Sequence, residues 1–464
     1  MGWFSWLYYM ILLFFISSSV SSSSIPLSSA PPPFPSFPSC HIDDSKALLQ
    51  FKNSFSIDHT LSCGADFPPP TIFWESGTDC CGWIGLTCNN ITGHVIGLDL
   101  TCCMLWGIIH SNSSLFLLRH LQTLILSLDN DFRGSTIPPE FGTFTDLLHL
   151  EIWSANFAGD IPLEISYLSK LQTLEVYSGN QQLRLNTSTF KRIVTNLTNL
   201  QNLTLADVDM SRIDLCFFDE FVIFFDIPLP LLLSLRILDL SGTNFSIDIL
   251  DPTRNLKSLD GLYLSNCRLI GSYPVLFGNL TQLASVGLSN NNISGQIPWS
   301  SFNPKRLTYL SLAERIPWKN LQFLDLHSNI LHGHLPIPPP SVEVFSISHN
   351  QLIGEVPLLI CNLSSLEVLD LANNGMSGKL PPCIGNLSGS LSVLDIRMNK
   401  FHGTIPRQLF AKENILRNLN LNGNEFEGSL PRSLLNCKKL EVLDIGNNHI
   451  NGMFPHWLES LQML

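Results

Sequence analysis

The residue types that usually carry catalysis do not occur with catalytic spacing in this chain. The sequence contains no His-Glu-x-x-His metal motif, no Gly-x-Ser-x-Gly nucleophile turn, no Cys-x-x-Cys pair, no phosphate-binding glycine loop and no kinase motifs. The 13 histidines are scattered along the chain, so we expect them at surface positions and not as metal ligands. The sequence therefore predicts a protein that is not an enzyme and that has no cofactor and no metal site.

One small group of side chains is suited to recognition. The tetrapeptides LEIW and LEVY share a pattern that places Glu151 in the same position as Glu175, and Trp153 in the same position as Tyr177. If these segments are adjacent strands, an exposed aromatic pair lies beside an acidic pair, an arrangement frequent in binding hot spots for peptides or glycans. The alternative is that the two rings stack across the strands and bind nothing.

These tetrapeptides belong to a repeat that fills most of the chain. Its pattern is Leu-x-x-Leu-x-Leu-x-x-Asn-x-φ-x-Gly-x-φ-Pro, where φ is an apolar residue, and most copies are spaced by 24 or 25 residues. The second apolar position of each copy marks 15 turns: Leu98, Leu124, Leu150, Leu174, Leu203, Leu238, Leu262, Val286, Leu310, Leu324, Phe345, Leu369, Leu394, Leu419 and Leu443. Such a period predicts a solenoid, because one turn cannot bury its own apolar residues.

The pattern also predicts the structure of each turn. Leucines that alternate with other residues form a short strand, and strands of successive turns become parallel neighbours. An asparagine after the strand can satisfy backbone groups that the bend leaves unpaired. This position holds Asn291, Asn329, Asn350, Asn374, Asn399, Asn424 and Asn448. Asp325, Asp370, Asp395 and Asp444 recur within the strands, so we interpret them as structural and not as a site.

The repeat resembles the plant-specific class of leucine-rich repeat. This resemblance implies an α/β-class leucine-rich-repeat solenoid, a right-handed superhelix with a parallel β-sheet on the concave face and a convex side of 3-10 or irregular structure. In this class the extended φ-Pro segment adds a second small sheet. The concave face is the surface that solenoids use for recognition.

Residues 40–93 read as the amino-terminal cap of the solenoid. The segment CHIDDSKALLQFKNSF predicts a helix with Ala47, Leu48, Phe51 and Phe55 on one side, and FWESGTDCCGWIGLTC follows it. These motifs closely resemble the cap of plant leucine-rich-repeat receptors. The resemblance implies two disulfides, Cys40–Cys80 and Cys81–Cys88, although Cys63 is an additional cysteine in this chain. Cys361 and Cys383 are spaced so that they could bridge adjacent turns, or could remain two buried thiols.

From about Cys40 onward, the chain is similar to plant receptor-like proteins of the tomato leaf-mould resistance type. The stretch WKNLQFLDLHSNILHGHLPIPPPS is part of this similarity. The resemblance implies an extracellular receptor in defence or developmental signalling that is anchored by one membrane span, lacks a kinase domain and signals through a co-receptor kinase. Its ligand would be an extracellular peptide, glycan or protein. The alternative is a secreted leucine-rich-repeat inhibitor of a pathogen cell-wall hydrolase.

The amino terminus predicts entry into the secretory pathway. Residues 1–24 read as a signal peptide, although an uncleaved anchor is the alternative because no basic residue precedes the apolar run, and residues 25–39 form a Pro/Ser-rich linker. We expect a plasma-membrane location with the repeats outside, or secretion into the apoplast if the chain is complete. Ten Asn-x-Ser/Thr acceptors predict glycosylation at Asn90, Asn112, Asn186, Asn196, Asn202, Asn244, Asn279, Asn292, Asn362 and Asn386.

Three departures from the regular repeat occur within residues 94–464. The register is lost at 207–233, a turn is shortened at 311–320, and the chain reaches Leu464 inside a turn without a carboxy-terminal cap. We expect a truncated product or pseudogene product, or alternatively a natural soluble decoy. The net charge of −12 argues against a nucleic-acid partner; it permits a basic ligand, although solubility explains it equally simply.

Overall fold

The computed structural model describes residues 39–58, 68–127, 130–179, 182–211, 213, 234–243, 258–272, 282–295, 320–410, 414–453, 455–461 and 463. Cys63, Leu310 and the acceptors Asn244 and Asn279 lie outside the described residues, as do the predicted signal peptide and nearly all of the predicted linker. Among the described residues, no helix combines the length and the apolar character needed to cross a bilayer.

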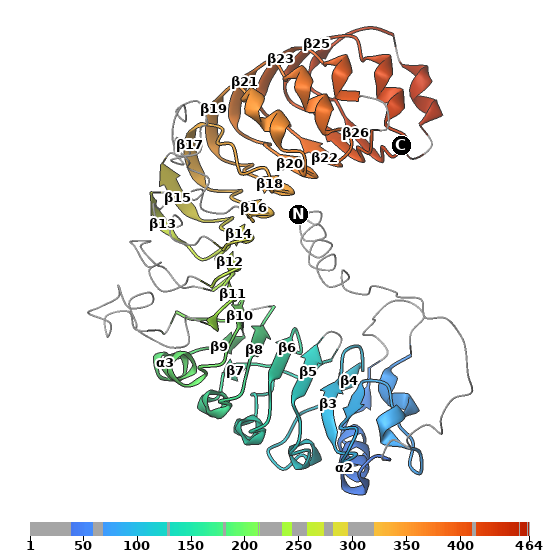
Figure 1. Ribbon diagram of the computed structural model, residues 1–464, viewed down its shortest axis with the longest axis vertical. Coiled ribbons are helices and arrows are strands. Elements are labelled where there is room, and N and C mark those ends of the chain that lie inside the picture. Colours follow the sequence, from blue (N-terminus) through green and yellow to red (C-terminus); the bar gives the residue numbers. More distant parts are fainter. Residues whose placement is uncertain are drawn as a thin grey trace, which may run out of the picture. The chain divides into compact units, whose positions relative to one another are not determined.

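A 15-stranded sheet runs through the solenoid (Figure 1). Its strands, in spatial order, are β2 (Leu86–Cys88), β3 (Val95–Asp99), β5 (Thr123–Ser127), β6 (His149–Trp153), β8 (Thr173–Tyr177), β10 (Asn202–Ala206), β11 (Ile237–Asp239), β12 (Gly261–Tyr263), β14 (Ser285–Gly287), β16 (Phe323–Asp325), β18 (Val344–Ser346), β20 (Val368–Asp370), β22 (Val393–Asp395), β24 (Asn418–Asn420) and β26 (Val442–Asp444). From β3 onward all pairings are parallel, and the marker residues of the paired strands lie opposite one another, as in Leu98↔Leu124 and Leu419↔Leu443. Val286 pairs directly with Leu324, so the prediction of a further strand between them, marked by Leu310, was wrong.

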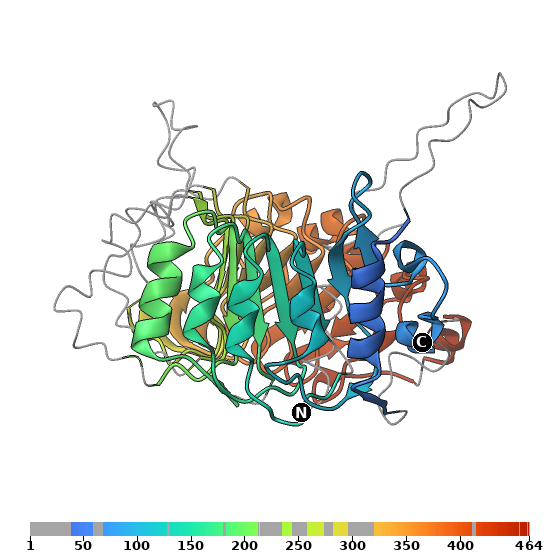
Figure 2. The same ribbon diagram turned by 90° about the horizontal axis from the view of Figure 1, so that it is seen from below.

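Among the described residues, the opposite side of most turns carries a short helix, as Figure 2 shows most clearly for the amino-terminal half, whereas the turn between β16 and β18 has none. These helices are η3 (Ser114–Leu117), η4 (Pro139–Thr143), η5 (Leu163–Tyr167), α3 (Thr187–Asn196), η10 (Leu358–Asn362), η11 (Pro382–Leu387), η12 (Arg407–Phe410), η13 (Arg432–Asn436) and η14 (His456–Ser460). Most are 3-10 helices, as expected, but α3 is a regular α-helix. Its Asn186 side chain caps it by accepting the Thr189 N–H at 3.0 Å.

The expected second sheet is present in the carboxy-terminal half. It has eight strands: β13 (Ile270–Ser272), β15 (Asn292–Gly295), β17 (Ile330–His334), β19 (Gln351–Gly354), β21 (Gly375–Gly378), β23 (Lys400–Thr404), β25 (Glu425–Gly428) and β27 (His449–Ile450). In the amino-terminal half, the described residues show the short pair β7 (Gly159–Asp160) and β9 (Leu183–Arg184) at this place, with isolated parallel bridges Trp106↔Asp131 and Arg184↔Asp209. The regular Gly-x-φ-Pro copies therefore coincide with the longer second sheet.

Apolar strand residues throughout the described turns, and asparagines of the carboxy-terminal turns, hold the stack together. The strand leucines are buried in one continuous apolar core. Asn329 donates from Nδ2 to the carbonyl oxygens of Leu288 (2.9 Å) and Leu326 (3.2 Å), and its Oδ1 accepts the Ile293 N–H at 3.1 Å. The same bonds recur at the other predicted asparagine positions. Each asparagine thus satisfies backbone groups of its own turn and of the turn before it.

The cap covers the first strand of the sheet. Helix α2 (Ile42–Lys52) buries Ala47, Leu48 and Phe51, whereas Phe55 lies beyond the end of the helix and packs edge-on against Phe51. Strand β2 pairs antiparallel with β3, and two short helices, η1 (Pro70–Phe73) and η2 (Cys80–Gly82), precede it. A two-stranded ribbon of β1 (Ser56–Ile57) and β4 (Leu105–Trp106) joins the cap to the first turn.

Disulfides reinforce both the cap and the outer side. The structure pairs Cys40 with Cys80 and Cys81 with Cys88, as the resemblance implied. A further disulfide joins Cys361 of η10 to Cys383 of η11, which decides between the two arrangements that the spacing left open. Cys102 is also disulfide-bonded. Cys103, Cys267 and Cys437 are buried free thiols.

Candidate functional site

The structure brings the four predicted recognition residues together on the sheet. Strands β6 and β8 are parallel neighbours, with Glu151 opposite Glu175 and Trp153 opposite Tyr177. The two aromatic rings are tilted by 46° with centroids 6.0 Å apart, and Trp153 Nε1 donates to Glu175 Oε2 at 3.2 Å. All four side chains are half-buried. We call Glu151, Trp153, Glu175 and Tyr177 the aromatic–acidic patch.

Both carboxylates of this patch have raised pKa values. Burial, together with the charge of Glu151, raises the pKa of Glu175 to about 7, although the bond from Trp153 opposes the shift. Burial and the charge of Asp99 also raise the pKa of Glu151. A positive group placed beside the two carboxylates would lower both pKa values.

Aspartates at the same register position in other strands have a different role. Asp325, Asp370 and Asp395 each accept the N–H of the residue two positions later, all at 3.1 Å. Such a bond closes the turn at the end of the strand, which agrees with their interpretation as structural residues. The Glu175 side chain is one methylene longer than that of an aspartate, and its carboxylate accepts from Trp153 instead.

Two further acidic residues adjoin the aromatic–acidic patch and were not predicted. Asp207 follows β10; burial raises its pKa, and a hydrogen bond from the Tyr177 side chain opposes the shift. Asp239 on β11 is two strands from Glu175, and burial raises its pKa as well. Asp239 could have been predicted from the sequence, because it occupies the same position in the repeat as Glu175. Asp207 lies where the repeat register is lost, so the pattern did not indicate it.

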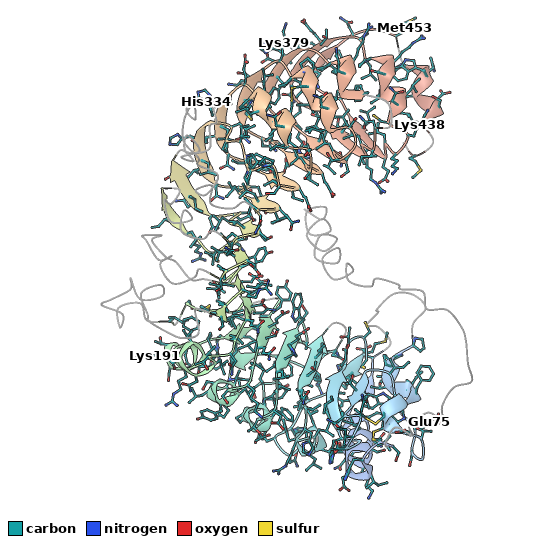
Figure 3. The ribbon with its side chains drawn as sticks, in the orientation of Figure 1. Glu75, Lys191, His334, Lys379, Lys438 and Met453 are labelled. Atoms are coloured by element: carbon teal, nitrogen blue, oxygen red, sulfur yellow. A yellow bond between two sulfur atoms is a disulfide. The ribbon has the colours of Figure 1, made fainter. Side chains whose placement is uncertain are left out.

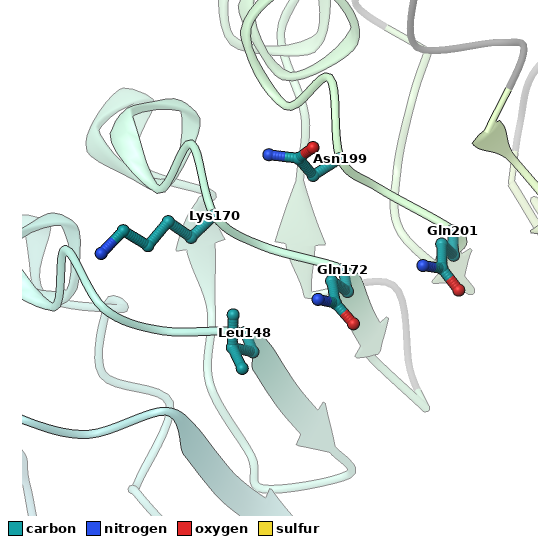
Figure 4. Close-up of a pocket in the computed structure, with 5 residues that line it drawn as sticks. All are labelled: Leu148, Lys170, Gln172, Asn199 and Gln201. Atoms are coloured by element: carbon teal, nitrogen blue, oxygen red, sulfur yellow. The ribbon is translucent and has the colours of Figure 1, made fainter.

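An open pocket of about 310 Å³ lies at the edge where β6, β8 and β10 begin (Figure 4). It is lined by Leu148, Lys170, Gln172, Asn199 and Gln201. The Lys170 ammonium is paired with Asp146 at 2.7 Å, and Asn199 Nδ2 donates to the Ser169 carbonyl oxygen at 2.9 Å. The side-chain amides of the two glutamines give the pocket neutral hydrogen-bonding groups.

Glycosylation acceptors are spread over several surfaces. Of the acceptors that the structure describes, Asn90, Asn112, Asn196, Asn292, Asn362 and Asn386 are exposed, and Asn186 and Asn202 are half-buried. Asn202 begins β10 and lies opposite Thr173, on the strand next to Glu175 and Tyr177. Glycosylation at any of these residues remains a prediction. Lys191 and Lys379, labelled in Figure 3, lie on the outer side of the solenoid.

The raised pKa of Glu175 predicts a pH-dependent stability. Between about 7 and the ordinary value of 4.5, folded Glu175 holds a proton that the unfolded chain does not, so folding becomes more favourable as the pH falls through this window. We expect Glu175→Gln, which keeps an acceptor for Trp153, to stabilise the protein at pH 8 by on the order of 1 kcal/mol and to have little effect at pH 5.

Thermal unfolding of both proteins at pH 5 and pH 8 measures this difference. Glu164→Gln, on η5 of the outer side and outside the aromatic–acidic patch, is the matched control. Equal changes in melting temperature for Glu175→Gln at the two pH values would contradict the prediction.

Two known protein families match the cap and several of the repeats. The Leucine rich repeat N-terminal domain matches residues 41–89, and the Leucine Rich Repeat family matches 258–280, 365–387, 416–437 and 439–461. Receptor-like protein 6 of Arabidopsis thaliana is 34% identical over 284 residues, which are 59% of this chain and 28% of the relative. Receptor-like protein Cf-9 of Solanum pimpinellifolium is 35% identical over 56% of this chain and 30% of its own length.

Receptor like protein 28 of Arabidopsis thaliana aligns with more of the chain. It is 34% identical over 92% of this chain and 60% of the relative. The chain thus spans less than two thirds of the length of each of these three relatives.

Solved structures support the same fold. The ectodomain of the Arabidopsis receptor kinase HAESA, in complex with an IDA peptide hormone, superposes with a TM-score of 0.51 and 23% identity, covering 91% of this chain and 80% of that one. A TDR receptor gives a TM-score of 0.52 and 24% identity, covering 76% of this chain and 64% of that one. At this identity, the likeness establishes the leucine-rich-repeat solenoid alone.

Proposed function

This chain is a leucine-rich-repeat protein whose curated relatives are plant receptor-like proteins, and on that premise we propose that it is the extracellular ligand-recognition part of such a receptor. It acts by binding and not by catalysis, and a partner receptor kinase supplies the signalling activity. The observation that carries this proposal is the aromatic–acidic patch on the sheet, where Trp153 lies beside Tyr177 and Glu151 beside Glu175.

The chemistry of the patch favours a peptide with a lysine or arginine side chain. Such a cation can lie over the face of Trp153 or Tyr177, at an attraction of roughly 0.5–2 kcal/mol. It would also relieve the repulsion between Glu151 and Glu175, and binding near pH 7 would then release the proton that Glu175 holds. An arginine has the additional advantage that its planar guanidinium can bond a carboxylate in two places.

A glycan on Asn202 would restrict the size of the ligand on one side of the patch. Asn202 lies opposite Thr173, and Thr204 lies opposite Glu175, on the strand that follows the patch. Such a glycan would stand on the strand next to Glu175 and Tyr177. An extended peptide of a few residues suits this setting better than a folded protein does.

Selection of peptides from a random display library tests the proposed function. We expect the wild-type chain to enrich peptides that carry arginine or lysine beside an apolar residue. Trp153→Ala removes one ring and the donor to Glu175, so we expect it to weaken binding of the selected peptides by at least tenfold, as for a hot-spot residue. Glu175→Gln is expected to weaken the binding of cationic peptides and to leave the binding of neutral peptides unchanged.

Tyr167→Ala is the matched control. Tyr167 is an aromatic residue of the same turn, 50% exposed on η5 of the outer side, and its loss is expected to leave binding unchanged. The proposal fails if no peptide is enriched, or if the selected peptides bind the Trp153→Ala and wild-type chains equally well.

A further inference from the structure

A cluster of histidines lies in the cap, apart from the aromatic–acidic patch. His41 is the N-cap of α2, Asp44 lies in the first turn of that helix, and His94 directly precedes β3. His120 comes from the turn before β5. Positions far apart in the sequence are therefore gathered where the cap meets the first turn of the solenoid.

The geometry within this cluster is close. The rings of His41 and His94 are stacked with centroids 4.1 Å apart, and the centroid of His120 lies 4.3 Å from that of His94. His94 Nδ1 lies 3.1 Å from Asp44 Oδ2, an oxygen that also accepts the Val95 N–H at 2.8 Å. One ligand atom each from His41, Asp44 and His94 lies within 4.8 Å of the others.

The backbone around these residues is firmly held. The His41 N–H donates to the Gly93 carbonyl oxygen at 2.9 Å, and Gly93 has a φ of +69° at a place where an added β-carbon would overlap the Ser39 carbonyl group. The disulfide from Cys40 fixes the residue next to His41. A site of this kind is already shaped before any ligand arrives, which lowers the cost of binding.

We propose that His41, Asp44 and His94 bind one divalent transition-metal ion, Zn²⁺ or Cu²⁺. Imidazole nitrogens with a carboxylate oxygen are donors that suit both ions. In a tetrahedral zinc site with bonds of about 2.0–2.1 Å, adjacent ligand atoms lie about 3.3 Å apart. The contact between His94 and Asp44 is already close to this separation, and a ligand atom of His41 lies within 4.8 Å of both.

The site is reachable from solvent and leaves a coordination position for another group. The side chains of His41 and His94 are 38% and 25% exposed, whereas that of Asp44 is 8% exposed. Three protein ligands leave the fourth position of a tetrahedral ion open to water or to His120. A bound ion would link α2 to the start of β3, and so tie the cap to the repeats.

Isothermal titration of the untagged chain, glycosylated as secreted, with Zn²⁺ and separately with Cu²⁺ tests this proposal. We expect one ion per chain, with Cu²⁺ bound more tightly if both fit. The melting temperature should rise by several degrees at an ion concentration about 100 times the dissociation constant.

Three conservative variants identify the ligands. His41→Asn keeps a helix N-cap, Asp44→Asn keeps an acceptor for the Val95 N–H, and His94→Gln keeps a polar side chain. Each is expected to weaken binding at least tenfold while the folded chain persists, which circular dichroism verifies. His402→Asn, an exposed histidine on β23, is the matched control and should bind like the wild type.

Two results would overturn the proposal. The first is that neither ion binds the wild-type chain more tightly than it binds the three cluster variants. The second is binding that also disappears in His402→Asn, because that would indicate scattered surface histidines. Neither result bears on the peptide selection, since the cluster lies outside the aromatic–acidic patch.

Discussion

Replacement of Gly385 by alanine is expected to destabilise the outer side of the solenoid by about 3 kcal/mol, at the upper end for overpacking. Gly385 lies in η11, and an added β-carbon there would overlap the carbonyl group of Gln408 in η12. The obstacle is backbone and not the end of a flexible side chain, so the two turns have to separate. An added β-carbon at Gly142 would likewise overlap the backbone of Glu164, so successive turns approach each other closely at more than one place on the outer side.

Hydrogen exchange of peptides that cover η11 and η12, together with urea denaturation, measures the effect of Gly385→Ala. We expect faster exchange around Leu387 and Leu409, whose side chains are buried between the turns. Gly389→Ala is the control, since an added β-carbon there meets no atom within 4 Å. If the two variants showed the same protection and the same urea midpoint, close packing of the turns would not be limiting.

Substitution of Asn399 by alanine is expected to cost about 3 kcal/mol as well, because several buried backbone groups lose their partners at once. Asn399 Nδ2 donates to the carbonyl oxygens of Leu371 (2.9 Å), Ile396 (3.1 Å) and Arg397 (3.2 Å). Its Oδ1 accepts the Met376 N–H at 3.0 Å. The alanine offers neither a donor nor an acceptor, and water has little access to a residue that is 8% exposed.

Asn418→Ala is the control for this substitution. Asn418 is half-buried in β24, on the sheet and outside the asparagine position of the repeat. Urea denaturation should therefore show a large shift for Asn399→Ala and a shift below about 0.5 kcal/mol for Asn418→Ala. A small effect of both substitutions would show that the asparagine bonds add little to the stacking of turns.

The repeat register and the contacts that follow from it could be predicted from the sequence. Leu98 pairs with Leu124 because each strand has one apolar face, and a slip by one residue would expose it. The bonds of Asn329 and its equivalents follow from the same register. The placement of Trp153 beside Tyr177 needed only the additional assumption that the two turns are adjacent.

Features that depend on the outer side of the turns could not be predicted. The spacing of Cys361 and Cys383 permitted a bridge, but only the positions of η10 and η11 decide it. The overlap at Gly385 depends on the distance between two turns and has no sequence signal. The histidine scatter suggested surface residues, because His41 and His94 are brought together only when the cap folds onto the first turn.

Strand pairing in the sheet is independent of how much chain lies between two strands. Leu203 pairs with Leu238 and Val286 with Leu324, in the same register as turns separated by 24 residues. The chain between two strands can therefore be lengthened without changing the register of the strands on either side. Recognition residues on the sheet would keep their positions relative to one another when such a connection gains or loses residues.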